Sequence, residues 1–515
     1  MKQLCSVLIC IAFFTQAWAQ EELKRIEDPP PKELQFIGYS FTRMTTTNVT
    51  PTNDVLQGQV IGRLFGPNST NTLPQTSLYA EQRFVPFMVY KPSILDGYAT
   101  FRALFKIDYT WGDQAYGVGN NRGGGLNAGQ VNLQTLLANV EIHPPDATWN
   151  VVIGLQRLFD NVRDPNVNTL QTAQTSSYKL SYWGTQAVGI NLFTNLSPET
   201  KARLGFFQLW ENLISKDDDV ALWMFDVESR VTPGLELGAD LWYLHDFGQE
   251  GGGISVLGQG LTSALSEYNG SVRIRFNGTS QKYKAHLFWL GAHAAYNRDF
   301  LMSRWWIDGY VMANVGTIDS LGTQQGKAAN VIGLTANASV SYKYGMTAND
   351  KVMLEALYTT GDKDGVADGT LNSVLTGNIW GSPVGIYSSH RALLLFPDPQ
   401  VVNRYYSAVH DISNMGLGTT AFFVNAYKDF IPNKFSGKIG VAAALSNVAP
   451  TGGGKYIGTE VNAEVKYNLK VFLTLGASAG YLTLGDFYDA PTITNTGKKP
   501  ANPWVFFTTL TWLMF

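Results

Sequence analysis

The sequence predicts an all-β protein, a single transmembrane antiparallel β-barrel, and three observations support this prediction. Aromatic residues make up 13% of the 515 residues, whereas charged residues make up only 15%, against about 25% in ordinary soluble domains. Beyond the first twenty residues no apolar run reaches eighteen residues, so the sequence offers no transmembrane helix. Many stretches alternate apolar and polar residues, and the mean hydropathy is −0.07, as expected for strands with one lipid-facing and one lumen-facing side.

The N-terminus has the features of a secretory signal peptide. Lys2 precedes an apolar run over residues 4–14, and Ala17-Trp18-Ala19 supplies the small-x-small cleavage pattern. We expect residues 1–19 to be removed; a short N-terminal anchor is the alternative. Cys5 and Cys10 would leave with this segment, so the mature chain would have no disulfide, no cysteine metal site and no cysteine nucleophile.

The mature chain divides into a short tail and the barrel. Residues 20–33 are charged and rich in proline, which predicts a periplasmic N-terminal tail, and residues 34–515 form the predicted barrel. Removing Lys2 leaves 37 basic residues against 41 acidic ones, a net charge of about −4. This balance is unlike that of a nucleic-acid-binding protein, so no nucleic-acid partner is expected.

The stretch over residues 98–112 shows the alternation most clearly. Phe101, Phe105 and other apolar residues occupy its odd positions, whereas Arg102, Lys106 and Asp108 occupy even positions. A helix with 3.6 residues per turn would scatter the apolar residues around its circumference, so the pattern indicates a strand. At about 3.4 Å per residue and a tilt of about 45°, fourteen residues cross a hydrocarbon layer of about 30 Å.

The turn residues divide the barrel into about eighteen strands, with sixteen to twenty possible, joined alternately by short periplasmic turns and long extracellular loops. An extra strand within 271–283 is an alternative. Long loops are expected near 45–81, 112–129, 158–185, 247–283, 362–415 and 485–502. The predicted strands are 34–44, 82–91, 97–111, 130–143, 148–157, 186–196, 201–211, 219–231, 235–246, 284–296, 303–316, 332–346, 351–361, 416–429, 436–446, 458–468, 470–483 and 503–515.

The last strand ends the chain on Phe515, which resembles the C-terminal signal of bacterial outer-membrane proteins. Together with the signal peptide, it predicts the outer membrane of a Gram-negative-type cell and outer-membrane lipid as a partner. A periplasmic partner cannot be named from the sequence.

Charged residues of both signs fall on the predicted lumen faces, where they would select solutes by charge and size. The expected function is a channel for small or oligomeric polar solutes, including anions and oligosaccharides. One alternative is that these charges only satisfy one another; another is a binding or structural barrel that acts through its external loops as an adhesin or assembly platform. The candidate residues are Arg102, Lys106, Asp108, Arg203, Asp226, Glu228, Arg230, Glu236, Asp240, Arg304, Asp308, Lys351, Glu355, Glu460, Glu464 and Lys466.

The loop over residues 362–415 has two unusual features. Asp362, Asp364 and Asp368 are spaced like half of a calcium loop, although Ser373 at position twelve excludes an EF-hand. Calcium is therefore one hypothesis and a solvated acidic loop the other; no other cofactor is expected. The loop is also too long and too apolar for a plain connection, so we expect a constriction or lid in the pore, with packing outside the pore as the alternative.

Enzymatic residues are sparse, and the sequence predicts no enzyme. Ser388, Ser389 and His390 lie in the same loop as His410 and Asp411, which leaves a hydrolytic site as a minor alternative. Proximity in sequence does not make a triad, because a triad is defined by geometry.

Three segments resemble the alginate-export family of outer-membrane barrels: "EALYTTGDKDG" (355–365), "RWWIDGYVMANVG" (304–316) and "VVIGLQRLFDN" (151–161). Leu155 and Thr360 depart from that family's usual Arg and Ser. The resemblance implies an eighteen-stranded channel whose lumenal basic residues bind a polyuronate. The residues that could take this role here are Arg102, Lys106, Arg203 and Arg304.

Overall fold

The computed structural model describes residues 33–51, 60–65, 70–111, 131–158 except 145 and 147, 185–249 except 212 and 215, 282–321, 326–376, 391–494 except 399, and 498–514. The chain forms two compact units, Met1–Glu33 and Leu34–Phe515. Only Glu33 of the first unit is described, so the signal peptide and the periplasmic tail remain predictions. The terminal Phe515 also lies outside the described residues.

The second unit is a closed antiparallel barrel. Nineteen strands share its sheet; one, β15 (Thr370–Leu371), only pairs in parallel with β13 (Gly326–Lys343). The other eighteen described strands form the wall, which β1 and β21 close in the register Gly38↔Met514. They are β1 (Leu34–Pro51), β3 (Thr70–Tyr90), β4 (Ala99–Thr110), β5 (Val131–Ile142), β6 (Trp149–Leu158), β7 (Thr185–Asn195), β8 (Thr200–Trp210), β9 (Val220–Thr232), β10 (Leu235–Asp246), β11 (Tyr283–Tyr296), β12 (Trp305–Ser320), β13, β14 (Lys351–Thr359), β17 (Thr419–Ile431), β18 (Phe435–Ser446), β19 (Tyr456–Lys470), β20 (Leu473–Leu484) and β21 (Trp504–Met514).

The remaining elements are short. β2 (Val60–Arg63) pairs in parallel with β16 (Arg404–Ser407), outside the barrel sheet. The helical turns are η2 (Ser93–Leu95), η3 (Arg298–Phe300), η5 (Asn414–Gly416), η6 (Asp486–Asp489) and α3 (Pro491–Thr494). None of the described helices is long and apolar enough to span a membrane.

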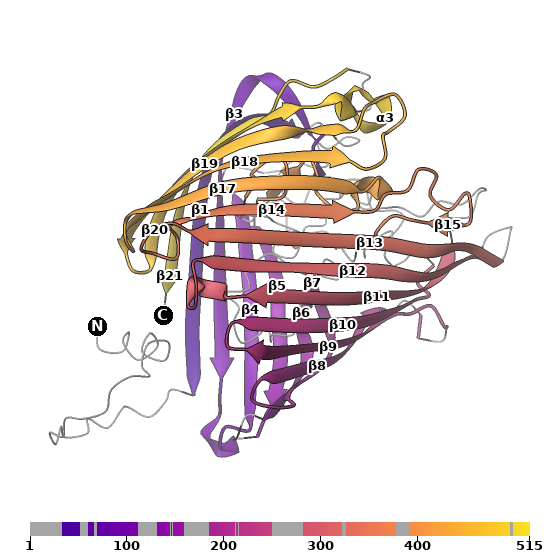
Figure 1. The fold of residues 1–515 in the computed structure, drawn as a ribbon. Coiled ribbons are helices and arrows are strands. Elements are labelled where there is room, and N and C mark those ends of the chain that lie inside the picture. The colour runs from indigo at the N-terminus through magenta and orange to yellow at the C-terminus, as the bar shows by residue number, and fades with distance from the viewer. Residues whose placement is uncertain are drawn as a thin grey trace. The chain divides into compact units, whose positions relative to one another are not determined.

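All eighteen predicted strands are present, and strands β8 to β14 and β17 to β19 lie side by side in Figure 1. The expected loop over 45–81 is wrong, because β1 and β3 pair from Leu34↔Tyr90 to Pro51↔Thr70. β12 and β13 are likewise longer than expected at their outer ends, reaching Ser320 and beginning at Gly326. Polar residues continue these strands after the apolar alternation stops, so hydropathy does not reveal them. The possible strand within 271–283 lies almost entirely outside the described residues.

The two faces of each strand differ as predicted. On β4, Phe101 and Phe105 are 36% and 38% exposed, whereas Arg102, Lys106 and Asp108 point inward and are at most 6% exposed. The same contrast recurs around the barrel, with large apolar side chains exposed on the outer face. So large an apolar surface is stable only against lipid, so this is the outer face of a membrane-spanning barrel.

The interior of the barrel is packed. The main hydrophobic core combines inward side chains of the wall with residues 391–418, which we call the inner segment. Leu394, Leu395 and Phe396 of this segment are fully buried, and the Phe396 ring lies 5.2 Å from that of Phe423 on β17. This described part of the loop therefore folds into the pore, and for it the alternative of packing outside the barrel is wrong.

Candidate functional site: a charged lumen narrowed by the inner segment

The inner segment is held to β19 by a buried carboxylate. Glu460 is fully buried and accepts hydrogen bonds from the backbone N–H groups of Leu393, Leu394 and Leu395 at 2.7, 2.8 and 2.7 Å. Asn462 donates to the same carboxylate at 3.0 Å. Successive N–H groups around one carboxylate form a strong, charge-assisted contact. Glu460 was predicted to line the solute pathway, but it anchors the inner segment.

Further polar contacts anchor the segment at mid-height of the wall. Arg391 Nε lies 2.6 Å from Glu355, the central residue of β14. Arg43 on β1 forms an ion pair of 2.8 Å with Asp398 and also donates to the carbonyl of Gln400. These contacts place the segment deep in the lumen, because both wall residues lie well inside their strands.

The segment also reaches β3 and β4. Arg83 donates to the carbonyl of Val402 at 3.2 Å, and Asn403 bonds Glu81 through its N–H at 3.1 Å and Thr110 through its side chain at 2.9 Å. Since β3 and β14 are far apart in the closed strand order, the inner segment crosses the lumen and narrows it.

The buried charges of the wall are segregated. Among the described wall strands from β1 to β8, which leave out β2, there are six buried basic side chains and three buried acidic ones, a formal balance of +3. Over β9 to β21 one buried lysine stands against six carboxylates, a balance of −5 with histidine neutral. The first set is Arg43, Arg83, Arg102, Lys106, Arg157 and Arg203, with Glu81, Asp108 and Glu141; the second is Lys438, with Asp226, Glu228, Asp240, Asp246, Glu355 and Glu460.

Ion pairs fix the orientation of several of these charges. Arg83 binds Asp108 through two nitrogens at 2.8 Å each, and Lys106 lies 3.6 Å from the same carboxylate. Arg102 pairs with Glu141 on β5. Buried pairs of this kind orient the side chains that border the lumen, and removing one partner is costly.

A second network joins β8 to β11. Arg203 Nε lies 2.7 Å from Asp226, which also accepts the indole N–H of Trp242 at 2.9 Å. His293 lies between two carboxylates, 3.4 Å from both Glu228 and Asp240. The structure therefore brings together four of the predicted residues and adds His293, which the sequence did not indicate.

Several predicted residues lie at the periplasmic end instead. Arg230, Arg304 and Lys466 are exposed there, and Glu236 forms an ion pair of 3.0 Å with Arg298 beside the turn. At the end of a strand the residues of both faces reach solvent. The alternation of apolar and polar residues therefore does not tell a lumen-facing residue from one at the end of the barrel. Three more predicted residues are half-buried: Asp308 and Lys351 on the inward faces of β12 and β14, and Glu464 2.8 Å from Lys466.

Sequence reasoning missed Arg43, Arg83 and Arg157, although all lie in or at the edge of predicted strands. Extending the alternation of each predicted strand would have placed Arg43 and Arg83 on the inner face. Asp398 and Arg391 could not have been found this way, because they lie in the inner segment, which has no period.

The calcium hypothesis gains no support. Asp362 uses one oxygen for the N–H groups of Asp364 and Gly365, at 2.9 and 2.6 Å, and the other for that of Asn372 at 2.7 Å. The described part of the chain contains no cluster of three acidic, histidine or cysteine side chains placed to hold a metal ion. Asp362 thus shapes its own loop.

The residues of the possible hydrolytic site do not form a described triad. His410 is buried and lies 3.4 Å from Ser407 Oγ, while Asp411 accepts hydrogen bonds from Thr376 and Ser413. Burial lowers the pKa of His410 to about 3. Ser388, Ser389 and His390 lie outside the described residues.

The fold and the lumen define a charge-lined, membrane-spanning β-barrel. Solved structures similar to it include OpdK of Pseudomonas aeruginosa, with 11% identity, a TM-score of 0.49 and coverage of 93% of this chain and 99% of that one. OccAB4 of Acinetobacter baumannii has 11% identity, a TM-score of 0.47 and coverage of 94% and 99%. The channel DcaP of A. baumannii has 11% identity, a TM-score of 0.41 and coverage of 93% and 97%. These likenesses are too distant to transfer a function.

No protein-family model and no curated protein matches the sequence. The resemblance to the alginate-export family therefore gains no support and rests on its short motifs alone.

Proposed function

We propose that this protein is an outer-membrane channel for small polar solutes, in which solutes pass beside the inner segment. The observation that carries the proposal is the segregated charge of the wall, +3 over β1 to β8 and −5 over β9 to β21 among the described residues. Some of these charges hold the inner segment, but a structural support alone would not require an excess of one sign on each part of the wall, because each buried charge costs desolvation energy.

The charge arrangement suggests how solutes would be selected. Opposed walls of opposite sign create a field across the lumen, which orients dipolar solutes and draws each ion toward the opposite wall. The inner segment sets the width of the passage, because it crosses the lumen at mid-height. Selectivity would therefore depend on both size and charge distribution.

The proposed location is the outer membrane of a Gram-negative-type cell, supported by the barrel architecture and the signal-like N-terminus. Neither β1 to β8 nor β9 to β21 carries only basic side chains. Glu460 anchors the inner segment and does not act to repel anions. A polyuronate substrate would rest on the alginate-export resemblance alone, so the proposal is limited to small polar solutes of either sign.

Single-channel recording in planar bilayers tests the proposal. We expect discrete conductance steps from the purified protein and none from a mock preparation of the same detergent. If only background current appears at protein levels that insert barrels, the channel function is wrong, and a barrel acting through its external loops becomes the better explanation.

A further inference from the structure

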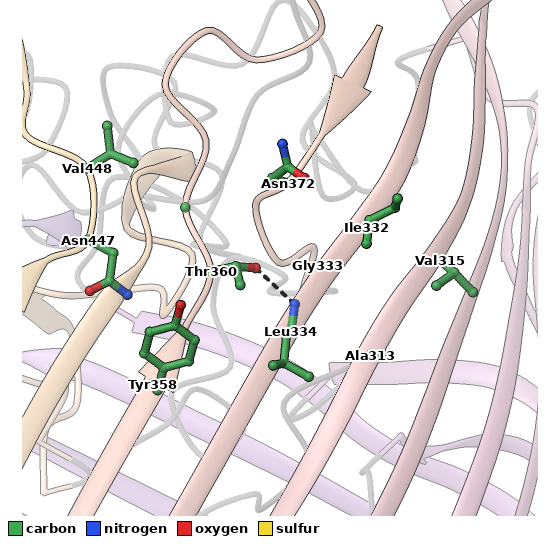
Figure 2. Close-up of a pocket in the computed structure, with 11 residues that line it drawn as sticks. Ala313, Val315, Ile332, Gly333, Leu334, Tyr358, Thr360, Asn372, Asn447 and Val448 are labelled. Atoms are coloured by element: carbon green, nitrogen blue, oxygen red, sulfur yellow. Dashed lines mark hydrogen bonds between the residues drawn. The ribbon is translucent and has the colours of Figure 1, made fainter. Parts of the chain in front are cut away.

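The outer wall has a notch where β14 ends early. β14 stops at Thr359 after nine residues, whereas β13 has eighteen and continues outward to Gly326. Above Thr359, on the side of β13 that β14 occupies below, the only described partner of β13 is the two-residue β15. The notch is about 500 Å³ in volume, within the range of ligand pockets. Figure 2 shows Ile332 and Leu334 on one side and Tyr358, Asn447 and Val448 on the other.

The notch lies near the upper edge of the apolar band. Its residues Val315 and Ile332 are each ten positions from the exposed rings Trp305 and Tyr342, which pack 4.7 Å apart at the periplasmic end of β12 and β13. Ten residues of a strand tilted by about 45° rise about 24 Å, and the apolar band of such barrels is about 25 Å tall. The notch is therefore level with the junction of acyl chains and head groups in the outer leaflet.

The notch opens toward the bilayer and is closed toward the lumen. Ile332, Leu334 and Tyr358 are 58%, 43% and 42% exposed and continue the lipid-facing surface. Behind them Ser373 and Val374 are fully buried. They pack so tightly against Gly333 that a Cβ there would lie 2.7 Å from the Ser373 carbonyl. An occupant would therefore come from the membrane.

The notch also contains polar groups at the level of Leu334 and above it. Thr360 Oγ1 accepts the N–H of Leu334 at 2.9 Å, as Figure 2 shows. Asn447 bonds the Thr359 carbonyl and the Thr420 hydroxyl, and the exposed Asn372 lines the notch further out. Apolar and polar groups at one level match the part of a lipid where an acyl chain joins its polar head group.

We propose that the notch binds one acyl chain of an outer-leaflet membrane lipid. Two observations favour a lipid over other occupants: the notch is continuous with the lipid-facing surface, and its floor separates it from the lumen. The inference rests on the membrane location given in the proposed function, but it does not require that the barrel conduct. A negative conductance recording would therefore leave the lipid site standing, and a negative lipid-binding result would leave the channel function standing.

Native mass spectrometry of the delipidated barrel tests the site, with dimyristoyl phosphatidylethanolamine as probe. We expect one lipid to survive collisional activation that removes the others. Ala313→Trp, which fills the notch from β12, should reduce the retained fraction about tenfold, the effect of 1.4 kcal/mol. Ala463→Trp, on the outer face of β19, is the matched control and should retain the lipid. Val448→Trp fills the notch from a loop without altering a strand.

Three outcomes would overturn the site. The first is that the wild type retains no lipid. The second is that both filling variants, shown to be folded by heat-modifiable migration, retain as much lipid as the wild type. The third is retention of free myristic acid in preference to the phospholipid, which would assign the notch to a soluble amphiphile.

Discussion

At the scale of single residues, the lumen shows that a charge on an inward face can have two different roles. Glu460 and Glu464 lie four positions apart on the same face of β19. Glu460 is fully buried and binds three backbone N–H groups of the inner segment, whereas the half-buried Glu464 binds Lys466 and the side chain of Gln400. Of the two carboxylates, only Glu460 is required to hold the backbone of the inner segment in the lumen.

Glu460→Gln should loosen the inner segment. The amide has one acceptor oxygen in place of two and turns an NH₂ group toward the N–H donors, so we expect local opening to become easier by about 2–4 kcal/mol. Hydrogen exchange of the amides of Leu393, Leu394 and Leu395 should accelerate about 30- to 1000-fold. Glu464→Gln is the control and should leave these amides unchanged; equal acceleration in both variants would contradict the anchoring role.

His410 should make the inner segment less stable in acid. Its pKa is lowered by burial to about 3, whereas a histidine in an unfolded segment titrates near 6.5. The stabilisation is therefore complete above pH 6.5 and is lost as the pH falls toward 3, by about 1.4 kcal/mol per pH unit. Exchange of residues 391–418 at pH 7 and pH 5 should show this, and His410→Gln should be less pH-dependent. An identical slope in both proteins would refute the assignment.

At the scale of elements, the inner segment determines how much of the barrel is open. It belongs to the loop over residues 362–415, and the two ends of this loop meet, because the N–H of Asp362 donates to the carbonyl of Gly416 at 2.7 Å. A loop with adjacent ends can be removed without pulling β14 and β17 apart, and these strands pair directly from Lys351↔Tyr427 to Thr359↔Thr419.

Replacing residues 363–415 with a short Gly-Ser linker should therefore widen the channel. We expect single-channel conductance to rise about two- to fivefold, because an eighteen-stranded barrel is too wide for its wall side chains to fill. Heat-modifiable migration in detergent checks that the barrel still folds. A folded variant with unchanged conductance would show that the segment does not limit the passage.

At the scale of the whole molecule, charge is divided between two arcs of the wall. Arg102 and Lys106 represent the basic arc, and Glu228 and Asp240 represent the acidic one. Each of these side chains has partners, yet each arc keeps a net charge. This net charge becomes apparent only when the strands are placed in their order around the closed barrel.

Neutralising the two arcs should shift ion selectivity in opposite directions. In a salt gradient, Arg102→Ala with Lys106→Ala should move the reversal potential toward cations, and Glu228→Gln with Asp240→Asn toward anions. Both shifts should shrink at 1 M salt, where the screening length falls to about 3 Å. Shifts of the same sign would contradict a transverse field.

The sequence alone predicted about eighteen wall strands, with sixteen to twenty possible, and the two faces of each. Alternation is a local property with a period of two, so Phe101 and Arg102 could be assigned to opposite faces without knowing any neighbour. Only the tertiary structure decided which charges pair, that residues 391–418 cross the lumen, and that β14 leaves a notch. These features depend on strand register and on the path of an aperiodic loop, which bring residues as distant as Arg43 and Asp398 into contact, and no local pattern records them.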